Sequence, residues 1–366
     1  MTNICLYLHS IKNAGGAEKR LTSLANYLSK YNYNVFIMTW DRQEDNSFYK
    51  IDKKIKWIKV EYKYGYLNKI KNIIKVIKFL KNKKIKIFIG FVMSGFKTLF
   101  IACKFSNTQI IVAERNSPSM YKIKFNFISR IFIYINLSLS SKIVVQLKEY
   151  IKNYPFFLRK RMHVIENYIP LQNLDKYKES KKEDKFFKIL LVSRLDNEQK
   201  NLDKLIFALS EINSKYLKII RVTIIGHGKD YQLILNLIDK LNLQSIIKII
   251  TPKTNDLSHF YSNSDLFVIP SKWEGVSNSL IEAMSYGLPI IALKDCQGMG
   301  YFVKNSYNGY LVETDPQSVL LDKYLYKLID DKDFRIQLGK NSYKLINSIN
   351  TVDDRIKWRN LIENSK

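Results

Sequence analysis

The stretch Pro270-Ser-Lys-Trp-Glu-Gly-Val-Ser-Asn-Ser-Leu-Ile-Glu282 joins an apolar segment to a glycine turn and the start of a helix. The apolar run 266–269 before it predicts a buried strand, and Ser277 or Asn278 can cap the helix that follows. Free backbone N–H groups at a helix N-terminus bind anions, and Gly275 lets a ligand approach the backbone closely. The stretch therefore predicts an α/β fold with an anion-binding loop at the end of a strand.

Two glutamates stand eight positions apart in this stretch. Glu274 lies in the turn and Glu282 about one turn into the helix, so both can border one cleft without touching. Ionised carboxylates only accept hydrogen bonds, which suits the hydroxyl groups of a sugar. Solvated helices often produce a bare pair of glutamates at this spacing, but the strand, the glycine turn and the helix around this pair favour a functional site.

Arg194 and Lys200 follow another predicted strand, 188–192. A diphosphate leaving group acquires charge in the transition state, so a guanidinium and an ammonium beside it would stabilise the transition state more than the ground state. The alternative is a solvated basic loop. Gly226, which follows the predicted strand 221–225, indicates a tight turn.

Strands and helices alternate along the chain. The strand 4–8, the helix 17–28 and the strand 35–40 form a βαβ unit, which implies a parallel sheet. A charged stretch without an apolar face, between about 171 and 185, predicts a linker to a second α/β series. Further strands are expected at 85–91, 109–113, 142–145, 246–250 and 265–269. The pattern predicts two α/β domains.

Length and composition agree with this organisation. At 366 residues the chain is long enough for two domains with separate cores. No segment approaches the roughly 18 to 20 uninterrupted apolar residues of a membrane span, and the N-terminus is expected to be a first strand instead of a signal peptide. The three cysteines lie far apart, and no histidine forms a pattern with a cysteine or carboxylate. We therefore expect a reducing cytoplasm, no metal ligand and no cofactor.

At these motifs the chain resembles the retaining glycosyltransferases of family 4, with their GT-B fold and E-x7-E signature. The resemblance runs from Gly15-Gly16-Ala17-Glu18 through the loops already quoted to Asn308-Gly309-Tyr310-Leu311-Val312. It implies two Rossmann-like domains that face each other across a cleft. We expect an acceptor domain over 1–173, a linker over 174–185 and a donor domain over 186–345, with the helix 350–366 packing back on the first domain.

The resemblance also implies roles for individual residues. Glu274 would contact hydroxyls of the donor sugar, Glu282 would hold the ribose, and Arg194 and Lys200 would bind the diphosphate. The expected donor-binding residues also include Gly275, Val276, Ser277, Asn278, Gly226, Gly15 and Gly16. Glu114, Arg115 and Asn116 correspond to a family segment on the acceptor side. Some relatives have a histidine there, whereas this chain offers Arg115, so no general base is assigned.

The reaction implied by the resemblance moves a sugar from a nucleoside diphosphate sugar to a lipid-linked or growing glycan. We expect a UDP-hexose or UDP-N-acetylhexosamine as donor, and capsule, lipopolysaccharide (O-antigen) or exopolysaccharide as product. One alternative is a sugar-nucleotide epimerase of GT-B-like fold, which needs no acceptor. Another is a non-catalytic, membrane-associated protein that binds sugar nucleotides. The intact Glu274, Glu282, Arg194 and Lys200 argue against both alternatives.

The net charge of +27 is concentrated in the first half of the chain. Residues 1–175 contain 31 Lys+Arg and 10 Asp+Glu, a net of +21, which leaves 29 minus 23, or +6, for residues 176–366. This asymmetry predicts an anionic partner, and the absence of an RRM-like or helix-turn-helix pattern argues against nucleic acid. The lysine-rich helical pattern 67–80 can lie on anionic lipid, or it can pack its apolar stripe on the sheet. A lysine-rich compositional bias is a third interpretation. We expect a cytoplasmic protein on the inner face of the cytoplasmic membrane.

Overall fold

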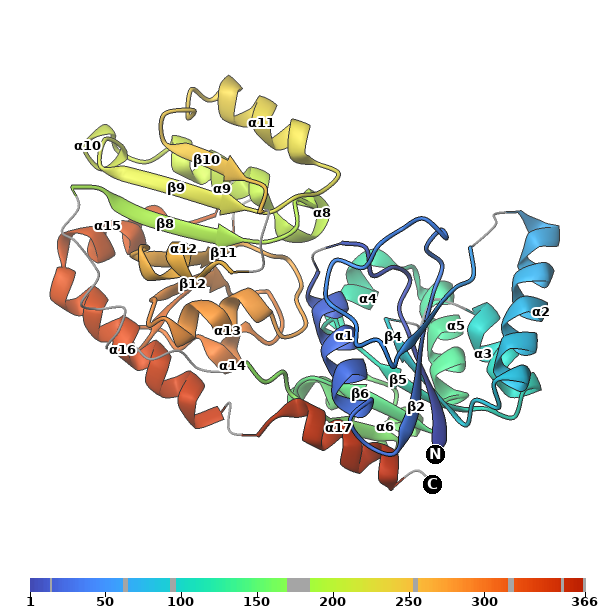
Figure 1. The fold of residues 1–366 in the computed structure, drawn as a ribbon. Helices are drawn as coiled ribbons and strands as arrows, with labels where there is room; N and C mark the ends of the chain where they lie inside the picture. The colour runs from blue at the N-terminus through green and yellow to red at the C-terminus, as the bar shows by residue number, and fades with distance from the viewer. Residues whose placement is uncertain are drawn as a thin grey trace. The chain divides into compact units, whose positions relative to one another are not determined.

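The computed structural model describes residues 1–13, 15–61, 65–92, 97–169, 185–252, 256–314, 319–349 and 352–364, without the side chains of residues 66 and 67. The chain divides into two compact units. Unit 1 comprises Met1–Asn167 and Val352–Lys366, and unit 2 comprises Tyr168–Thr351. Of the expected linker, 174–185, only Lys185 lies among the described residues. Figure 1 shows a sheet with flanking helices in each unit.

Unit 1 is built on a parallel sheet of seven strands in the order β3-β2-β1-β4-β5-β6-β7. The strands are β1 (Thr2–Tyr7), β2 (Tyr33–Thr39), β3 (Lys56–Lys59), β4 (Ile87–Phe91), β5 (Gln109–Ala113), β6 (Lys142–Val145) and β7 (Met162–Val164). The helices are α1 (Gly16–Leu28), α2 (Tyr66–Asn82), α3 (Lys97–Phe105), α4 (Ser119–Lys124), α5 (Phe127–Ser138), η1 (Lys148–Asn153), α6 (Phe156–Arg159) and α17 (Asp354–Glu363). The strand order reverses at β1. Because parallel crossovers are right-handed, α1 lies on one face of the sheet, and α2, α3 and α5, which connect the strands from β3 to β6, lie on the other.

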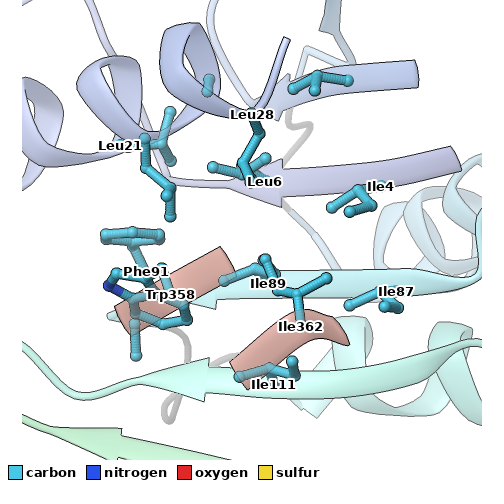
Figure 2. Packing of buried hydrophobic residues seen from close by; sticks show 14 of the residues in the cluster. Ile4, Leu6, Leu21, Leu28, Ile87, Ile89, Phe91, Ile111, Trp358 and Ile362 are labelled. Carbon is cyan, nitrogen blue, oxygen red and sulfur yellow. The ribbon is translucent and has the colours of Figure 1, made fainter. Parts of the chain in front are cut away.

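The α1 face of this sheet carries a continuous apolar core, drawn in Figure 2. Leu6 and Ile89 of the sheet are buried beneath Leu21 and Leu28 of α1. The C-terminal helix α17 completes the core with Trp358 and Ile362, although it is separated from unit 1 in sequence by the whole of unit 2. The ring of Trp358 stacks on Phe91 at a centroid distance of 5.9 Å. The end of the chain therefore belongs to the fold of unit 1.

Unit 2 is built on a parallel sheet of six strands in the order β10-β9-β8-β11-β12-β13. The strands are β8 (Phe187–Val192), β9 (Ile220–Ile225), β10 (Ile247–Ile250), β11 (Leu266–Ile269), β12 (Ile290–Leu293) and β13 (Gly309–Val312). The helices are α8 (Asn197–Lys200), α9 (Leu202–Ser210), α10 (Ser214–Leu217), α11 (Tyr231–Lys240), α12 (Ser258–Ser262), α13 (Asn278–Ser285), α14 (Met299–Phe302), α15 (Asp322–Asp330) and α16 (Lys332–Ile349). Counted within the unit, the order is 3-2-1-4-5-6, the doubly wound arrangement of dinucleotide-binding folds. The predicted α/β class with two Rossmann-like units is confirmed.

The structure differs from the sequence-based expectation in two respects. The strands β3, β7, β12 and β13, of three or four residues each, were not predicted. The apolar stripe of the helix 67–80 does not pack on the sheet as one surface. Val76 and Leu80 are buried, whereas Ile70 and Ile74 are about half exposed among lysines. The interpretation of this stripe as core holds for only part of it.

Candidate active site

The carboxyl ends of three neighbouring strands in unit 2 carry most of the predicted site residues. β8 leads into Arg194 and α8, β9 leads into Gly226, and β11 leads into Glu274 and α13. The strand order of the sheet reverses between β8 and β11. Open α/β sheets bind their ligands outside the carboxyl ends of the strands at this reversal, so the fold brings these residues to its preferred ligand site.

Two glycines after β9 allow the neighbouring loops to approach each other closely. A Cβ atom on Gly226 would lie 1.8 Å from the carbonyl oxygen of Ser193, and one on Gly228 would lie 2.3 Å from that of Leu195. No side chain fits at such distances from backbone. Gly226 therefore holds the loop after β8 in place, and its contact with a donor stays a prediction.

Lys200 and Glu274 form a buried ion pair at the centre of this site. The ammonium of Lys200 donates to Oε1 of Glu274, and both residues are less than a tenth exposed. The hydroxyl of Ser271 donates to the same oxygen at 2.6 Å. Asn201, whose left-handed backbone (φ 56°) separates α8 from α9, ends the short helix directly after Lys200. The pair joins a cation from the β8 loop to a carboxylate from the β11 loop.

Gln199 connects the same two loops and was not predicted from the sequence. Nη2 of Arg194 donates to the side-chain oxygen of Gln199 at 2.9 Å, and Nε2 of Gln199 donates to the carbonyl of Trp273 at 3.0 Å. The backbone N–H of Lys272 donates to the carbonyl of Gln199 at 2.9 Å. Gln199 thereby orients the guanidinium of Arg194 and fixes the backbone immediately before Glu274. In the sequence, only the position of Gln199 next to Lys200 could have indicated this role.

Glu282 is held by a tyrosine that sequence reasoning also missed. The hydroxyl of Tyr261 donates to Oε2 of Glu282 at 2.9 Å, and its ring stacks on Tyr286 at 5.3 Å. Burial, together with the charge of Glu282, raises the pKa of Tyr261 well above its usual range, so the hydroxyl stays protonated and donates. The cap of α13 is Ser277, whose hydroxyl accepts from the N–H of Leu280 at 3.4 Å.

The turn between Glu274 and α13 is closely packed. Gly275 and Val276 are buried, and Asn278 begins the helix after the Ser277 cap. Cys296 is buried nearby, where desolvation and the charge of Glu274 raise the pKa of its thiol. The thiol therefore remains protonated and adds no charge beside the ion pair.

The other predicted residues lie in unit 1. Gly15 is the N-cap of α1, and a Cβ atom there would lie 2.0 Å from Oε2 of Glu18, whose side chain folds over the glycine. Gly16 begins the helix and is exposed. Gly16 stands in the first turn of α1, where backbone N–H groups have no acceptor within the helix, whereas the N–H of Gly15 donates to the carbonyl of Asn13 at 3.1 Å. Their contact with a donor stays a prediction.

The segment after β5 turns two of its three predicted residues toward protein partners. Glu114 is buried and accepts hydrogen bonds from the hydroxyls of Tyr121 and Tyr154, the latter at 3.0 Å. Nη2 of Arg115 donates to the side-chain oxygen of Asn167 at 2.7 Å. Burial and the charge of Arg20 lower the pKa of Arg115 to about 10, so it remains charged at neutral pH. Asn116 is partly buried. Direct contact of these three residues with an acceptor stays a prediction.

No group of three or more His, Cys, Asp or Glu side chains in the described part of the chain is placed to hold a metal ion. Across the same residues, the structure contains no helix whose length and apolar character would allow it to cross a membrane.

Comparison with known proteins identifies the family. Residues 173–345 match the family model described as glycosyl transferases group 1. An uncharacterized glycosyltransferase of Haemophilus influenzae is 29% identical over 351 residues, which cover 93% of this chain and 94% of that protein. Residues 173–345, most of unit 2, belong to the group 1 glycosyl transferases, and the chain is a glycosyltransferase. The amylovoran biosynthesis glycosyltransferase AmsD of Erwinia amylovora is 25% identical to this transferase over 373 residues, which cover 99% and 100% of the two chains.

Solved structures show that this transferase has the GT-B fold. Staphylococcus aureus TarM, crystallised with UDP, superposes with a TM-score of 0.79 at 15% identity, and 99% of each chain is covered. WaaG, a glycosyltransferase involved in lipopolysaccharide biosynthesis, gives a TM-score of 0.74 at 17% identity and 96% coverage of each chain. The protein is a glycosyltransferase, an enzyme that takes a sugar from a nucleotide sugar.

Proposed function

We propose that the protein moves a hexose or N-acetylhexosamine from a UDP-sugar to a lipid-linked or growing glycan during surface polysaccharide assembly, with retention at the anomeric carbon. The observation that carries this proposal is the buried Lys200–Glu274 pair at the strand reversal of unit 2. It sets a cation for a phosphate beside an acceptor for sugar hydroxyls. The pair therefore matches the two halves of a nucleotide sugar.

The names of several relatives support the choice of substrates. A Campylobacter jejuni relative, 24% identical over 97% of this chain, is named as an N-acetyl-D-galactosaminyltransferase acting on a diphosphoundecaprenol-linked glycan. An Escherichia coli relative, 35% identical over 28% of this chain, is named as a UDP-Gal-dependent galactosyltransferase acting on a diphosphoundecaprenol-linked sugar. Both names combine a sugar transfer with a lipid-linked acceptor, which is why we propose the same classes here.

In the proposed reaction, Arg194 and Lys200 bind the diphosphate. The bond between the anomeric carbon and the diphosphate oxygen breaks, and negative charge accumulates on the leaving diphosphate. A guanidinium oriented by Gln199 and an ammonium already desolvated in the protein stabilise that charge with little reorganisation. In the donor complex the ammonium of Lys200 would serve both the diphosphate and Glu274.

The two glutamates hold the donor, and neither is needed as a base. Glu274 would accept hydrogen bonds from hydroxyls of the sugar, and Glu282, fixed by Tyr261, from those of the ribose. The acceptor oxygen forms its bond to the anomeric carbon on the face that the diphosphate leaves. Its proton passes to an oxygen of that diphosphate. This route retains the configuration at the anomeric carbon.

A panel of UDP- and GDP-sugars tested for thermal stabilisation examines the proposal. A ligand that binds only the folded protein at 100 times its Kd stabilises it by about 2.7 kcal/mol. We expect a UDP-sugar to raise the Tm and a GDP-sugar to do so less. Arg194→Ala should remove the shift and nearly abolish transfer in a folded protein. Wild-type transfer by a folded Arg194→Ala, Glu274→Ala double variant would contradict the proposed site.

A further inference from the structure

Helix α5 turns a row of large apolar side chains outward. The exposed apolar side chains of α5 and its C-cap are Phe127, Ile128, Ile131, Phe132, Ile135 and Leu139. Phe127 is 68% and Ile128 65% exposed, while Asn136 is buried on the inner side. A surface helix ordinarily buries its apolar face and exposes polar residues. The outward face of α5 is therefore more apolar than is usual for a helix face that contacts only water.

The neighbouring helices extend this row into a surface. α5 packs against α4 and α6, and the ammonium of Lys97 in α3 lies 3.9 Å from the centre of the Phe132 ring. The exposed apolar side chains of these neighbours are Ile101 and Phe105 on α3, Ile123 on α4, and Phe156 and Phe157 on α6. Phe156, at 80%, is almost fully exposed. We call this set, together with the row on α5, the α3–α6 face. Clustered exposed apolar side chains of this kind mark an interaction surface.

The charge around the α3–α6 face is almost entirely positive. From the start of α3 to the end of α6, residues 97–159 contain ten Lys+Arg and two acidic residues, Glu114 and Glu149. Glu114 is buried and bonded to tyrosine hydroxyls, so it does not offset the surface charge. Lys122 and Lys124 are exposed on either side of Ile123 in α4. Long basic side chains beside apolar ones suit the boundary between lipid head groups and acyl chains.

We propose that the α3–α6 face is a membrane-insertion surface by which unit 1 sits on an anionic bilayer. Its phenylalanine and isoleucine side chains enter the acyl boundary, and the surrounding lysines contact anionic head groups. The charge selects this occupant over a second copy of the chain, because two such faces would bring like charges together. Insertion of the α3–α6 face also differs from binding through lysines alone. Salt screens the charges beyond about 8 Å, whereas the apolar contacts with the bilayer persist.

The proposal extends the proposed function, since a lipid-linked acceptor presents its sugar at the membrane surface. The exposed apolar side chains of unit 2 offer a matched comparison, because they lie on separate elements. Leu233 is on α11, Leu320 lies before α15, and Ile336 is on α16. Their exposed fractions of 51%, 45% and 43% are similar to those of α5. Substitution there should not affect lipid binding.

Vesicle sedimentation of the full chain tests the surface. The vesicles contain phosphatidylcholine alone or phosphatidylcholine with about one third phosphatidylglycerol. Each kind is tested at low salt and at 0.5 M salt. The α5 variant carries Phe127→Gln, Ile128→Gln and Ile135→Gln, and the control carries Leu233→Gln, Leu320→Gln and Ile336→Gln. We expect wild type and control to bind anionic vesicles and to retain part of that binding in high salt. The α5 variant should bind at least tenfold more weakly.

Insertion is measured separately with a fluorescent probe. Cys5, Cys103 and Cys296 are buried, so a cysteine introduced by Ile128→Cys can be labelled selectively with an environment-sensitive dye. Its emission should shift to shorter wavelength with anionic vesicles, and the same dye at Leu233→Cys should not respond. Unchanged vesicle binding by the α5 variant, or no binding by wild type, would overturn the proposal. A wild-type dimer that the α5 substitutions dissociate, with vesicle binding unchanged, would assign the face to a second copy instead.

Donor binding separates this proposal from the proposed function. The folded α5 variant should show the same Tm shift with a UDP-sugar as wild type. If no nucleotide sugar shifts the Tm of either protein, the proposed function fails, while the vesicle result still decides the membrane surface.

Discussion

At the scale of single residues, the Lys200–Glu274 pair makes a prediction about stability. Removing one partner of a buried ion pair leaves an uncompensated charge, which costs about 3–5 kcal/mol. Lys200→Met should therefore lower the free energy of unfolding by that amount. The double variant Lys200→Met, Glu274→Gln should recover part of the loss. Urea unfolding of wild type and of these two variants measures both effects.

An exposed ion pair in the same unit provides the control for this experiment. Lys294 and Glu313 are 2.8 Å apart, and their side chains are more than half exposed. Because water screens such a pair, Lys294→Met should leave the unfolding midpoint nearly unchanged. Equal losses at Lys200 and Lys294 would mean that the buried pair contributes nothing particular to stability.

Tyr261 supports a second residue-scale prediction, because it orients Glu282 through one hydrogen bond. Tyr261→Phe keeps the ring and its stacking on Tyr286 but removes the donor. Hydrogen bonds to charged groups contribute about 1.5–3 kcal/mol, so the Kd for UDP should rise at least about tenfold. Titration calorimetry measures this change. An unaltered Kd would show that Glu282 needs no orientation by Tyr261, or that it does not contact the nucleotide.

The charged residues of the candidate site were predicted from the sequence, whereas their contacts were not. Arg194, Lys200, Glu274 and Glu282 stand in short motifs after predicted strands, where local reasoning is effective. Lys200 and Glu274 are 74 positions apart, so their pairing depends on β8 and β11 being neighbours in the sheet. The supporting role of Tyr261 likewise arises only from tertiary packing.

At the scale of elements, the approach of two loops makes Gly226 sensitive to substitution. Gly226→Ala would place a Cβ atom against the backbone of the β8 loop, which must then move. We expect a loss of about 1–3 kcal/mol in the free energy of unfolding and a weaker affinity for UDP-sugar.

Gly300 in α14 is the matched control for Gly226. The nearest atom to a Cβ there would be Cδ1 of Leu311 at 3.9 Å, which is ordinary contact. Gly300→Ala should be neutral or slightly stabilising, since alanine favours helix. Urea midpoints compare the two variants. Equal midpoints for Gly226→Ala and wild type would show that the loops are not held as the structure indicates.

The elements themselves were predictable where they were long or strongly periodic. The helices α1 and α11 and the buried strands β1, β8 and β9 follow from apolar patterns. The outward apolar face of α5 did not, because a pattern of apolar residues does not tell which side of a helix meets the sheet. In the structure the buried residues of α5 are Ile133, Asn136 and Leu137.

At the scale of the whole molecule, the path of the chain ties its C-terminus to unit 1. Trp358 is 1% exposed and stacks on Phe91, so Trp358→Ala should destabilise unit 1 by about 3–5 kcal/mol. Hydrogen exchange followed by mass spectrometry should show faster exchange in β1, β4 and α1 and little change in the strands of unit 2. Ile356→Ala, at a partly exposed position of α17, is the control and should leave exchange unchanged. Faster exchange confined to unit 2 would contradict this assignment.

The two Rossmann-like units could be predicted from the sequence, because the alternation of strands and helices is a local pattern. One charged stretch interrupts this alternation and separates the two units. The prediction that α17 packs on unit 1 came from family resemblance. The apolar pattern of Asp354–Glu363 does not indicate which surface this helix contacts. The structure supplies that surface in α1 and the α1 face of the sheet.

The central claim is that the two partners of the Lys200–Glu274 pair bind different parts of a nucleotide sugar. Lys200 binds the diphosphate, and Glu274 binds the sugar. Titration calorimetry with UDP and with the UDP-sugar chosen by the thermal panel tests it directly. Lys200→Met should weaken the binding of both ligands at least about tenfold, or about 1.4 kcal/mol. Glu274→Gln should weaken the UDP-sugar by a similar factor and leave UDP nearly unchanged. Equal losses for the two ligands in Glu274→Gln, or wild-type affinity in both variants, would contradict the account.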